Sequence, residues 1–196
     1  AIEISKFSKC FIVNSVFMGN EAPTFGGGVN AEYGIIISFY KVKFIYNSAR
    51  FGAGISLQKV HSCSVAKSLF IENTAGHSGG AIYYDGTFEG IVNVYRVSFN
   101  NNTAIMTGAG IQLKHFHKSS VVHSIFIGNM AESGGGIDGK YGIKVNIYRV
   151  QFMNNTASVV GGGTRLENIS YSSIVHSSFI SNVVGNDITA TKGGSM

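Results

Sequence analysis

The amino-acid sequence predicts an all-β fold, a β-solenoid of about seven coils with about 27 residues in each coil. Three observations predict it: a motif that recurs at a nearly fixed period, strand-like alternation of apolar residues before each motif, and glycine clusters after it. Glycine accounts for 26 of the 196 residues, about twice its ordinary share of roughly 7%. Tight backbone corners are therefore frequent. We expect one repetitive domain over residues 1–196.

The recurring motif is Phe-x-x-Asn, in which x is any residue. Its seven copies follow one another at intervals of 27, 26, 29, 27, 26 and 27 residues and span nearly the whole chain. If the coils stack in register at about 4.8 Å, the aromatic rings form one parallel column inside the rod. The phenylalanines are Phe17, Phe44, Phe70, Phe99, Phe126, Phe152 and Phe179.

The asparagine of each motif superposes on its counterpart in the next coil. Each amide can then bond the next one in an internal ladder that stabilises the stack. An alanine follows two residues later in six copies, and a glycine cluster follows that alanine in six copies. We therefore interpret the motif residues as structural rather than functional. The ladder asparagines are Asn20, Asn47, Asn73, Asn102, Asn129, Asn155 and Asn182.

The residues before each phenylalanine have strand periodicity. Apolar side chains recur at every second position, as in Val92 and Val94, with one extra residue where the chain must bend. This pattern predicts two or three short strands in each coil, separated by corners. Odd and even coils differ, because the fourth residue before the phenylalanine is tyrosine only in coils two, four and six. The larger repeat is therefore about 54 residues, with large and small side chains interleaved along the rod.

The third and fourth coils carry a recognisable combination of motifs. Residues 70–75 read Phe-Ile-Glu-Asn-Thr-Ala, and residues 79–82 read Gly-Gly-Ala-Ile. This combination resembles the repeats of the polymorphic outer membrane proteins, and the resemblance covers essentially the full length of the chain. It implies a right-handed parallel β-helix of the pectin-lyase-like type, carried by surface or secreted proteins that are often adhesive. We therefore expect an extracellular or cell-surface location.

Positive charge gathers at one repeat position. The net charge is +5, and the third residue before each phenylalanine is mostly basic, including His123 and His176. A row of cations beside aromatic rings can hold an acidic polysaccharide. The alternative is a solvated strand face that keeps the rod soluble. Nucleic acid is not an expected partner, because no recognised module is present. The residues of this candidate glycan-binding face are Lys41, Lys67, Arg96, Arg149, Tyr40, Tyr95 and Tyr148.

The sequence does not favour an enzyme or a cofactor. Polysaccharide hydrolases and lyases need clustered carboxylates, and so do calcium sites. The acidic residues here are scattered, and we assign Glu32, Asp85, Glu89 and Asp138 to loops after glycine clusters, where Asp-Gly is ordinary turn chemistry. A polysaccharide-degrading enzyme is therefore the least favoured hypothesis, and neither a cofactor nor a metal is predicted.

Two histidines could form a metal pair. His115 and His117 flank Phe116, so both could point to one strand face. No third ligand stands nearby in the sequence, and solvent-facing histidines are therefore favoured over a metal site.

The two cysteines and three sequons receive structural interpretations. Cys10 and Cys63 hold the same position in coils one and three, which places their Cα atoms about 9.6 Å apart, beyond the reach of a disulfide. Two free, buried thiols are predicted.

The sequons at Asn101, Asn154 and Asn168 occur about as often as chance allows. The first two share an outward repeat position, where stacked glycans are a hypothesis if the protein is secreted by a eukaryote.

The ends of the chain suggest assembly. Neither end shows an amphipathic capping helix, and no apolar run approaches the roughly 18 residues of a transmembrane segment. Uncapped coil ends offer unpaired backbone groups to other strands. We expect either a segment of a longer solenoid or subunits that associate end to end. The predicted function is a non-enzymatic extracellular structural protein, a filament or surface-fibre subunit. The alternative is an adhesin that binds acidic polysaccharide.

Overall fold

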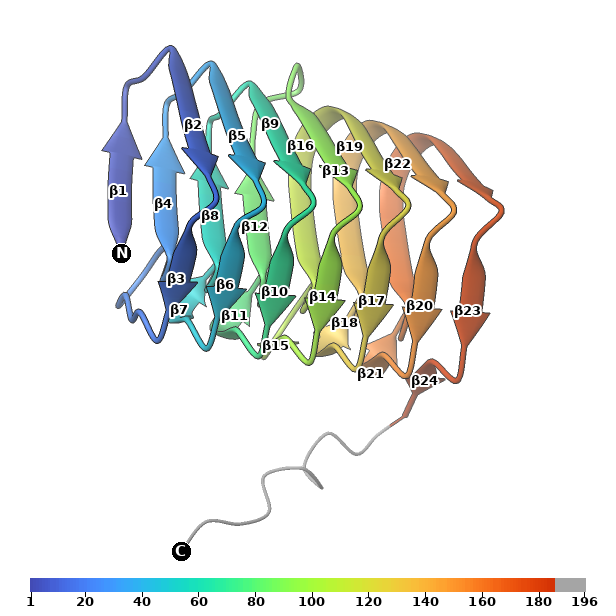
Figure 1. Ribbon diagram of the computed structural model, residues 1–196. Helices are drawn as coiled ribbons and strands as arrows, with labels where there is room; N and C mark the ends of the chain where they lie inside the picture. Colours follow the sequence, from blue (N-terminus) through green and yellow to red (C-terminus); the bar gives the residue numbers. More distant parts are fainter. Residues whose placement is uncertain (186–196) are drawn as a thin grey trace, which may run out of the picture.

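The fold is a β-solenoid of about seven turns with about 27 residues in each turn, as the sequence predicts. The computed structural model describes residues 1–185, so residues 186–196 of the predicted domain lie outside the described part. Figure 1 shows the coils stacked along one axis, with equivalent strands of successive coils side by side. The described residues contain strands but no helix, and hence no helix that is long and apolar enough to span a membrane.

The largest sheet has eleven strands and contributes one or two strands to each coil. In coils one to four it supplies two short strands, whereas in coils five to seven these join into one strand of 12 residues. Coils two to four therefore have four strands each, more than the two or three that the sequence predicts, because the six-stranded sheet adds a further strand to each of them. Its members are β1 (Ile2–Ser5), β2 (Lys9–Val13), β4 (Val29–Glu32), β5 (Ile36–Tyr40), β8 (Ile55–Gln58), β9 (Ser62–Ala66), β12 (Ile82–Asp85), β13 (Ile91–Tyr95), β16 (Ile111–Val122), β19 (Ile137–Tyr148) and β22 (Thr164–Val175).

Two smaller parallel sheets complete each coil. The seven-stranded sheet carries the motif phenylalanines on β3 (Val16–Met18), β6 (Lys43–Ile45), β10 (Leu69–Ile71), β14 (Ser98–Asn100), β17 (Ile125–Ile127), β20 (Gln151–Met153) and β23 (Ser178–Ile180). The six-stranded sheet follows the ladder asparagines and consists of β7 (Ser48–Phe51), β11 (Thr74–Ser78), β15 (Thr103–Ala104), β18 (Met130–Ser133), β21 (Thr156–Val160) and β24 (Val183–Val184).

The motif phenylalanines form the predicted aromatic column. Strand pairing places each one opposite its counterpart in the next coil, for example Phe70 opposite Phe99. Neighbouring rings are nearly parallel, and their centroids lie 4.5–5.0 Å apart. The five inner rings are fully buried. Because each ring packs against the rings above and below it, the column joins consecutive coils into one core.

The structure also brings the seven motif asparagines into one ladder. In the first six, the side-chain Nδ2 donates to the Oδ1 of the next asparagine at 2.8–3.0 Å. The same Nδ2 donates to the backbone carbonyl of a phenylalanine in the coil before, as Asn73 does to Phe44 at 3.0 Å. The amides from Asn47 to Asn155 are fully buried. They satisfy one another inside the rod, which removes the cost of burying a polar group.

Glycine clusters form one corner of each coil. The first glycine of every cluster has a left-handed backbone with φ of 61–71°, a region that glycine enters without steric cost. The third position passes close to the next coil, since a Cβ added at Gly28 would lie 2.6 Å from the carbonyl oxygen of Gly54. The clusters are therefore needed for both the turn and the stacking distance.

The predicted loop positions of three acidic residues are wrong. Glu32 and Asp85 are the last residues of β4 and β12, and Asp138 lies inside β19. The corner uses only the glycines, so a strand begins directly after them. Asp138 is fully buried, and desolvation raises the pKa of its carboxyl group. Its closest cation is Arg165, 3.7 Å away in the next coil.

The cysteine prediction needs one correction. Both thiols are free, and strand pairing places Ile37 between Cys10 and Cys63, so they lie two coils apart. Cys63 is fully buried, and desolvation raises the pKa of its thiol to about 12. Cys10 is only half-buried, because coil one has a neighbouring coil on one side only within the described part.

Candidate functional site

The candidate site lies where each coil turns from the largest sheet into the seven-stranded sheet. One residue with a left-handed backbone makes each turn, with φ of 50–54°. A side chain in this conformation is strained by about 1 kcal/mol, except in glycine and, to a smaller degree, asparagine. Here the column contains no glycine. We call it the basic corner; its residues are Asn14, Lys41, Lys67, Arg96, His123, Arg149 and His176.

Tyrosines of the even coils hold the cations of the basic corner in place. The Nζ atoms of Lys41 and Lys67 lie 5.4 and 5.2 Å from the ring centroid of Tyr40, within cation–π range. Lys67 also donates a hydrogen bond to the Tyr40 hydroxyl at 3.1 Å. This bond, and the positive charge of both lysines, lower the pKa of Tyr40 although slight burial opposes them. One ring thus orders two cations from adjacent coils.

The same arrangement recurs in later coils with arginine. The guanidinium of Arg96 lies 5.1 Å from the ring centroid of Tyr95, and that of Arg149 lies 5.2 Å from the ring centroid of Tyr148. His123, in the coil between them, meets both tyrosine rings edge to face, with centroids 5.9 and 6.0 Å apart. The alternation of tyrosine along the sequence therefore corresponds to a structural unit of two coils.

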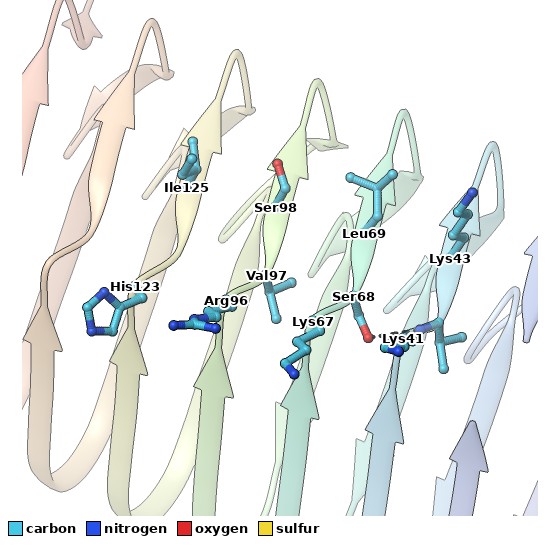
Figure 2. Close-up of a pocket in the computed structure, with 11 residues that line it drawn as sticks. Lys41, Lys43, Lys67, Ser68, Leu69, Arg96, Val97, Ser98, His123 and Ile125 are labelled. Atoms are coloured by element: carbon cyan, nitrogen blue, oxygen red, sulfur yellow. Dashed lines mark hydrogen bonds between the residues drawn. The ribbon is translucent and has the colours of Figure 1, made fainter. Parts of the chain in front are cut away.

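A groove of about 400 Å³ runs along the basic corner over coils two to five. Figure 2 shows Lys41, Lys67, Arg96 and His123 as one row along the groove, each from a different coil. The facing row consists of the first residues of β6, β10, β14 and β17, which are Lys43, Leu69, Ser98 and Ile125.

The floor of the groove offers no free polar group. Val42 and Val97 are apolar, and the Ser68 hydroxyl between them already accepts from the Val42 backbone amide at 3.0 Å and donates to the Ala66 carbonyl at 2.9 Å. The cations on the rim are therefore the groups that can contact a ligand. The apolar floor can pack against the hydrophobic face of a sugar ring.

The structure places the predicted glycan-binding residues in two roles. Lys41, Lys67 and Arg96 line the groove, and Arg149 continues the same corner beyond it. The tyrosines contact the cations but do not line the groove. Sequence reasoning missed the facing row of residues, Lys43, Leu69, Ser98 and Ile125. Its position, one residue before each phenylalanine, was visible in the repeat, but the direction of its side chains was not.

A second column has the same backbone conformation but mixed chemistry. It lies two residues after each phenylalanine, and its φ values are 49–65°. We call it the mixed corner; its residues are Gly19, Tyr46, Glu72, Asn101, Gly128, Asn154 and Ser181. Two sequon asparagines lie here and are exposed, and Asn168 has the same conformation at another corner with φ of 53°. Because asparagine tolerates this conformation, the backbone alone explains these residues. Their glycosylation stays a prediction.

The two histidines around Phe116 do not act as a pair. His115 has φ of 49°, which interrupts the strand alternation. Its Nδ1 lies 2.8 Å from Asp85 Oδ1, and its ring stacks on Tyr141, whereas His117 is exposed. Within residues 1–185, no three histidine, cysteine or acidic side chains gather as a metal site would require.

The comparison with known families agrees with the resemblance noted in the sequence. Residues 67–85 match the family model of the Chlamydia polymorphic membrane protein repeat. This segment is similar to a polymorphic membrane protein repeat. It includes Phe70, Asn73 and the cluster Gly79-Gly80, the residues on which the resemblance rested, and the resemblance is confirmed. No curated protein and no solved structure matches the chain. The polymorphic membrane protein repeat and the β-solenoid together fit a surface-associated protein.

Proposed function

We propose that this chain forms part of a cell-surface protein that binds acidic polysaccharides along its basic corner and does not catalyse a reaction. One observation carries the proposal: a row of basic side chains, one per coil from coil two to coil five, borders a groove with an apolar floor. None of the ion pairs between described residues involves this row. Its positive charge is therefore available to an external anion.

The spacing of the row suits a polysaccharide. Successive coils lie about 4.8 Å apart, which is close to the advance of one pyranose ring in an extended chain. An acidic sugar in each ring position can therefore meet one cation. Each contact is exposed and weak, but contacts along one chain act together because the first contact raises the local concentration of the remaining groups.

The choice of residues at the basic corner supports the same conclusion. Lysine and arginine hold a left-handed conformation that glycine or asparagine would adopt at lower cost. Other corners have the same conformation with uncharged side chains, so it is the uniform basic character of this column, and not its strain, that favours an anionic ligand. The polymorphic membrane protein repeat supports the surface location, where acidic polysaccharides are accessible.

The test is binding to dextran sulfate, measured by calorimetry at low and at moderate salt. We expect salt-sensitive binding, and at least about tenfold weaker binding for the double variant Arg96→Ala/Arg149→Ala, since each surface cation near an anionic ligand contributes roughly 1 kcal/mol. The matched control is Lys59→Ala/Lys140→Ala. Lys59 also has a left-handed backbone and lies over a tyrosine ring, at 4.9 Å from Tyr33, but outside the basic corner.

Absence of binding, or an equal loss of affinity in the control variant, would contradict the proposal.

The end-to-end filament stays a prediction from the sequence. Electron microscopy over a concentration series tests it: filaments with a short axial repeat would support it, and separate short rods at every concentration would contradict it.

A further inference from the structure

The charges of the basic corner are not all permanent. Coils two, three, four and six carry lysine or arginine, whereas coils five and seven carry His123 and His176. Histidine is the side chain that ordinarily changes its charge between about pH 5 and 8. The number of cations in the row therefore rises from four to six when both imidazoles are protonated.

His123 lies between two tyrosines of the basic corner. Its ring lies edge to face between Tyr95 and Tyr148, with interplanar angles of 87° and 86°. These are the same tyrosines that hold Arg96 and Arg149. The centroid distances of 5.9 and 6.0 Å lie within the range of about 6 Å over which a tyrosine ring attracts a cation. His123 thus contacts both tyrosine rings and also lines the groove.

His176 repeats this arrangement at the next odd coil. Its ring meets Tyr148 edge to face, with centroids 5.6 Å apart and an interplanar angle of 84°. Tyr148 therefore contacts Arg149 of its own coil and the histidines of the coils before and after it. The side chain is exposed, so an anion in solution can reach it.

A bound anion would favour the protonated form of these histidines. The charged groups beside His123 are Arg96 in the coil before and Arg149 in the coil after, each held over a tyrosine ring that His123 also contacts. No carboxylate within residues 1–185 forms an ion pair with either histidine of the corner. A polyanion bound along the row would place negative charge beside both imidazoles, and a nearby negative charge favours the protonated form of histidine.

We propose that His123 and His176 take up protons when the basic corner binds a polyanion, so that acidification strengthens binding. The inference rests on the proposed function. By linkage, a ligand that favours the protonated histidines must bind more tightly as the pH falls through their titration range. The contribution of His123 and His176 to polyanion affinity therefore changes with pH, whereas the lysines and arginine of coils two to four are permanently charged.

The experiment measures the affinity for dextran sulfate at constant ionic strength, at about pH 5.5 and about pH 7.5, on either side of the ordinary histidine titration. Sulfate esters stay ionised throughout, so the ligand does not titrate. We expect at least about fivefold tighter binding at the lower pH, the lower end of typical coupling between two sites. Calorimetry in buffers of different ionisation enthalpy should also show net proton uptake on binding.

Three variants make the test specific. The double variant His123→Gln/His176→Gln should bind at both pH values with the weaker affinity. His123→Arg should bind more tightly than the unmodified protein at the higher pH. The control His61→Gln/His117→Gln, which changes two exposed histidines outside the basic corner, should keep the full pH dependence.

The outcomes separate the two proposals. Binding that is independent of pH, or pH dependence that survives in His123→Gln/His176→Gln, would overturn this inference and leave the proposed function standing. No binding at either pH would overturn the proposed function and this inference with it.

Discussion

The basic corner and the mixed corner have the same backbone and different chemistry. Both consist of seven residues, one per coil, in the left-handed conformation, with φ of 50–54° in one and 49–65° in the other. The mixed corner uses glycine or asparagine in four coils and otherwise carries tyrosine, glutamate and serine. The basic corner uses asparagine once, and every other member is lysine, arginine or histidine.

The two corners show that the backbone conformation of the turn does not determine which side chain is exposed there. The turn needs only a left-handed residue, and the mixed corner shows that unrelated side chains meet this need. The turn therefore does not account for the uniform charge of the basic corner. The groove and the tyrosine contacts of that corner supply a reason, since they order the cations along one line.

The largest expected effect is on the free energy of unfolding, and it concerns the ladder asparagine that follows a residue of the mixed corner. Its residue Asn101 turns the chain so that Asn102 enters the ladder. Asn102→Leu should lower the free energy of unfolding by about 3 kcal/mol, because four buried hydrogen bonds are lost. The backbone amide and Nδ2 of Asn73 lose an acceptor, and the Asn129 Oδ1 and the Phe70 carbonyl lose a donor. Asn101→Gly keeps the turn and should change the free energy of unfolding by less than about 0.5 kcal/mol. Urea unfolding measures both, and similar losses would contradict this division.

The next effect compares the two corners directly. Arg96→Gly and Tyr46→Gly each replace a strained left-handed residue, so each should keep or raise the free energy of unfolding, by up to about 1 kcal/mol. Only Arg96→Gly should weaken dextran sulfate binding, by about fivefold, because it alone removes a cation from the groove. Thermal unfolding and calorimetry measure the two quantities. Equal affinities of the two variants for dextran sulfate would show that the Arg96 cation does not contribute to binding.

The smallest effect concerns the electrostatics of one tyrosine. The hydrogen bond from Lys67, with the charges of Lys67 and Lys41, lowers the pKa of Tyr40, so its hydroxyl should ionise at a lower pH than an ordinary tyrosine. Lys67→Ala should raise this pKa, and Lys140→Ala, outside the corner, should leave it unchanged. Carbon-13 NMR titration of labelled tyrosine follows each ring. An unchanged midpoint in Lys67→Ala would mean that the contact does not form in solution.

The repeat explains why the interior could be predicted from the sequence. Seven copies of Phe-x-x-Asn fix the register of the coils, and a fixed register places Phe99 on Phe126 and Asn102 on Asn129 without further information. Each prediction about the interior therefore had several independent copies to support it.

The surface could be predicted only in part. The repeat position shared by Lys67 and Arg96 was visible, and so was the tyrosine alternation beside it. The groove was not, because it depends on how sharply the left-handed residue turns the strand and on which side of the cations Leu69 and Ile125 lie. Asp138 shows the same limit: its Asp-Gly pair is typical of a turn, but the glycine cluster had already completed the corner.

The most direct test of the central claim is an amide NMR map of the protein with a sulfated oligosaccharide. If the groove binds the ligand, chemical-shift changes should concentrate at Lys41, Lys67, Arg96 and His123 and along β6, β10, β14 and β17. The mixed corner, which has the same backbone and lies at the other end of those strands, should stay unchanged. Changes that are as large at the mixed corner as at the basic corner would contradict the claim that the cations form a binding surface.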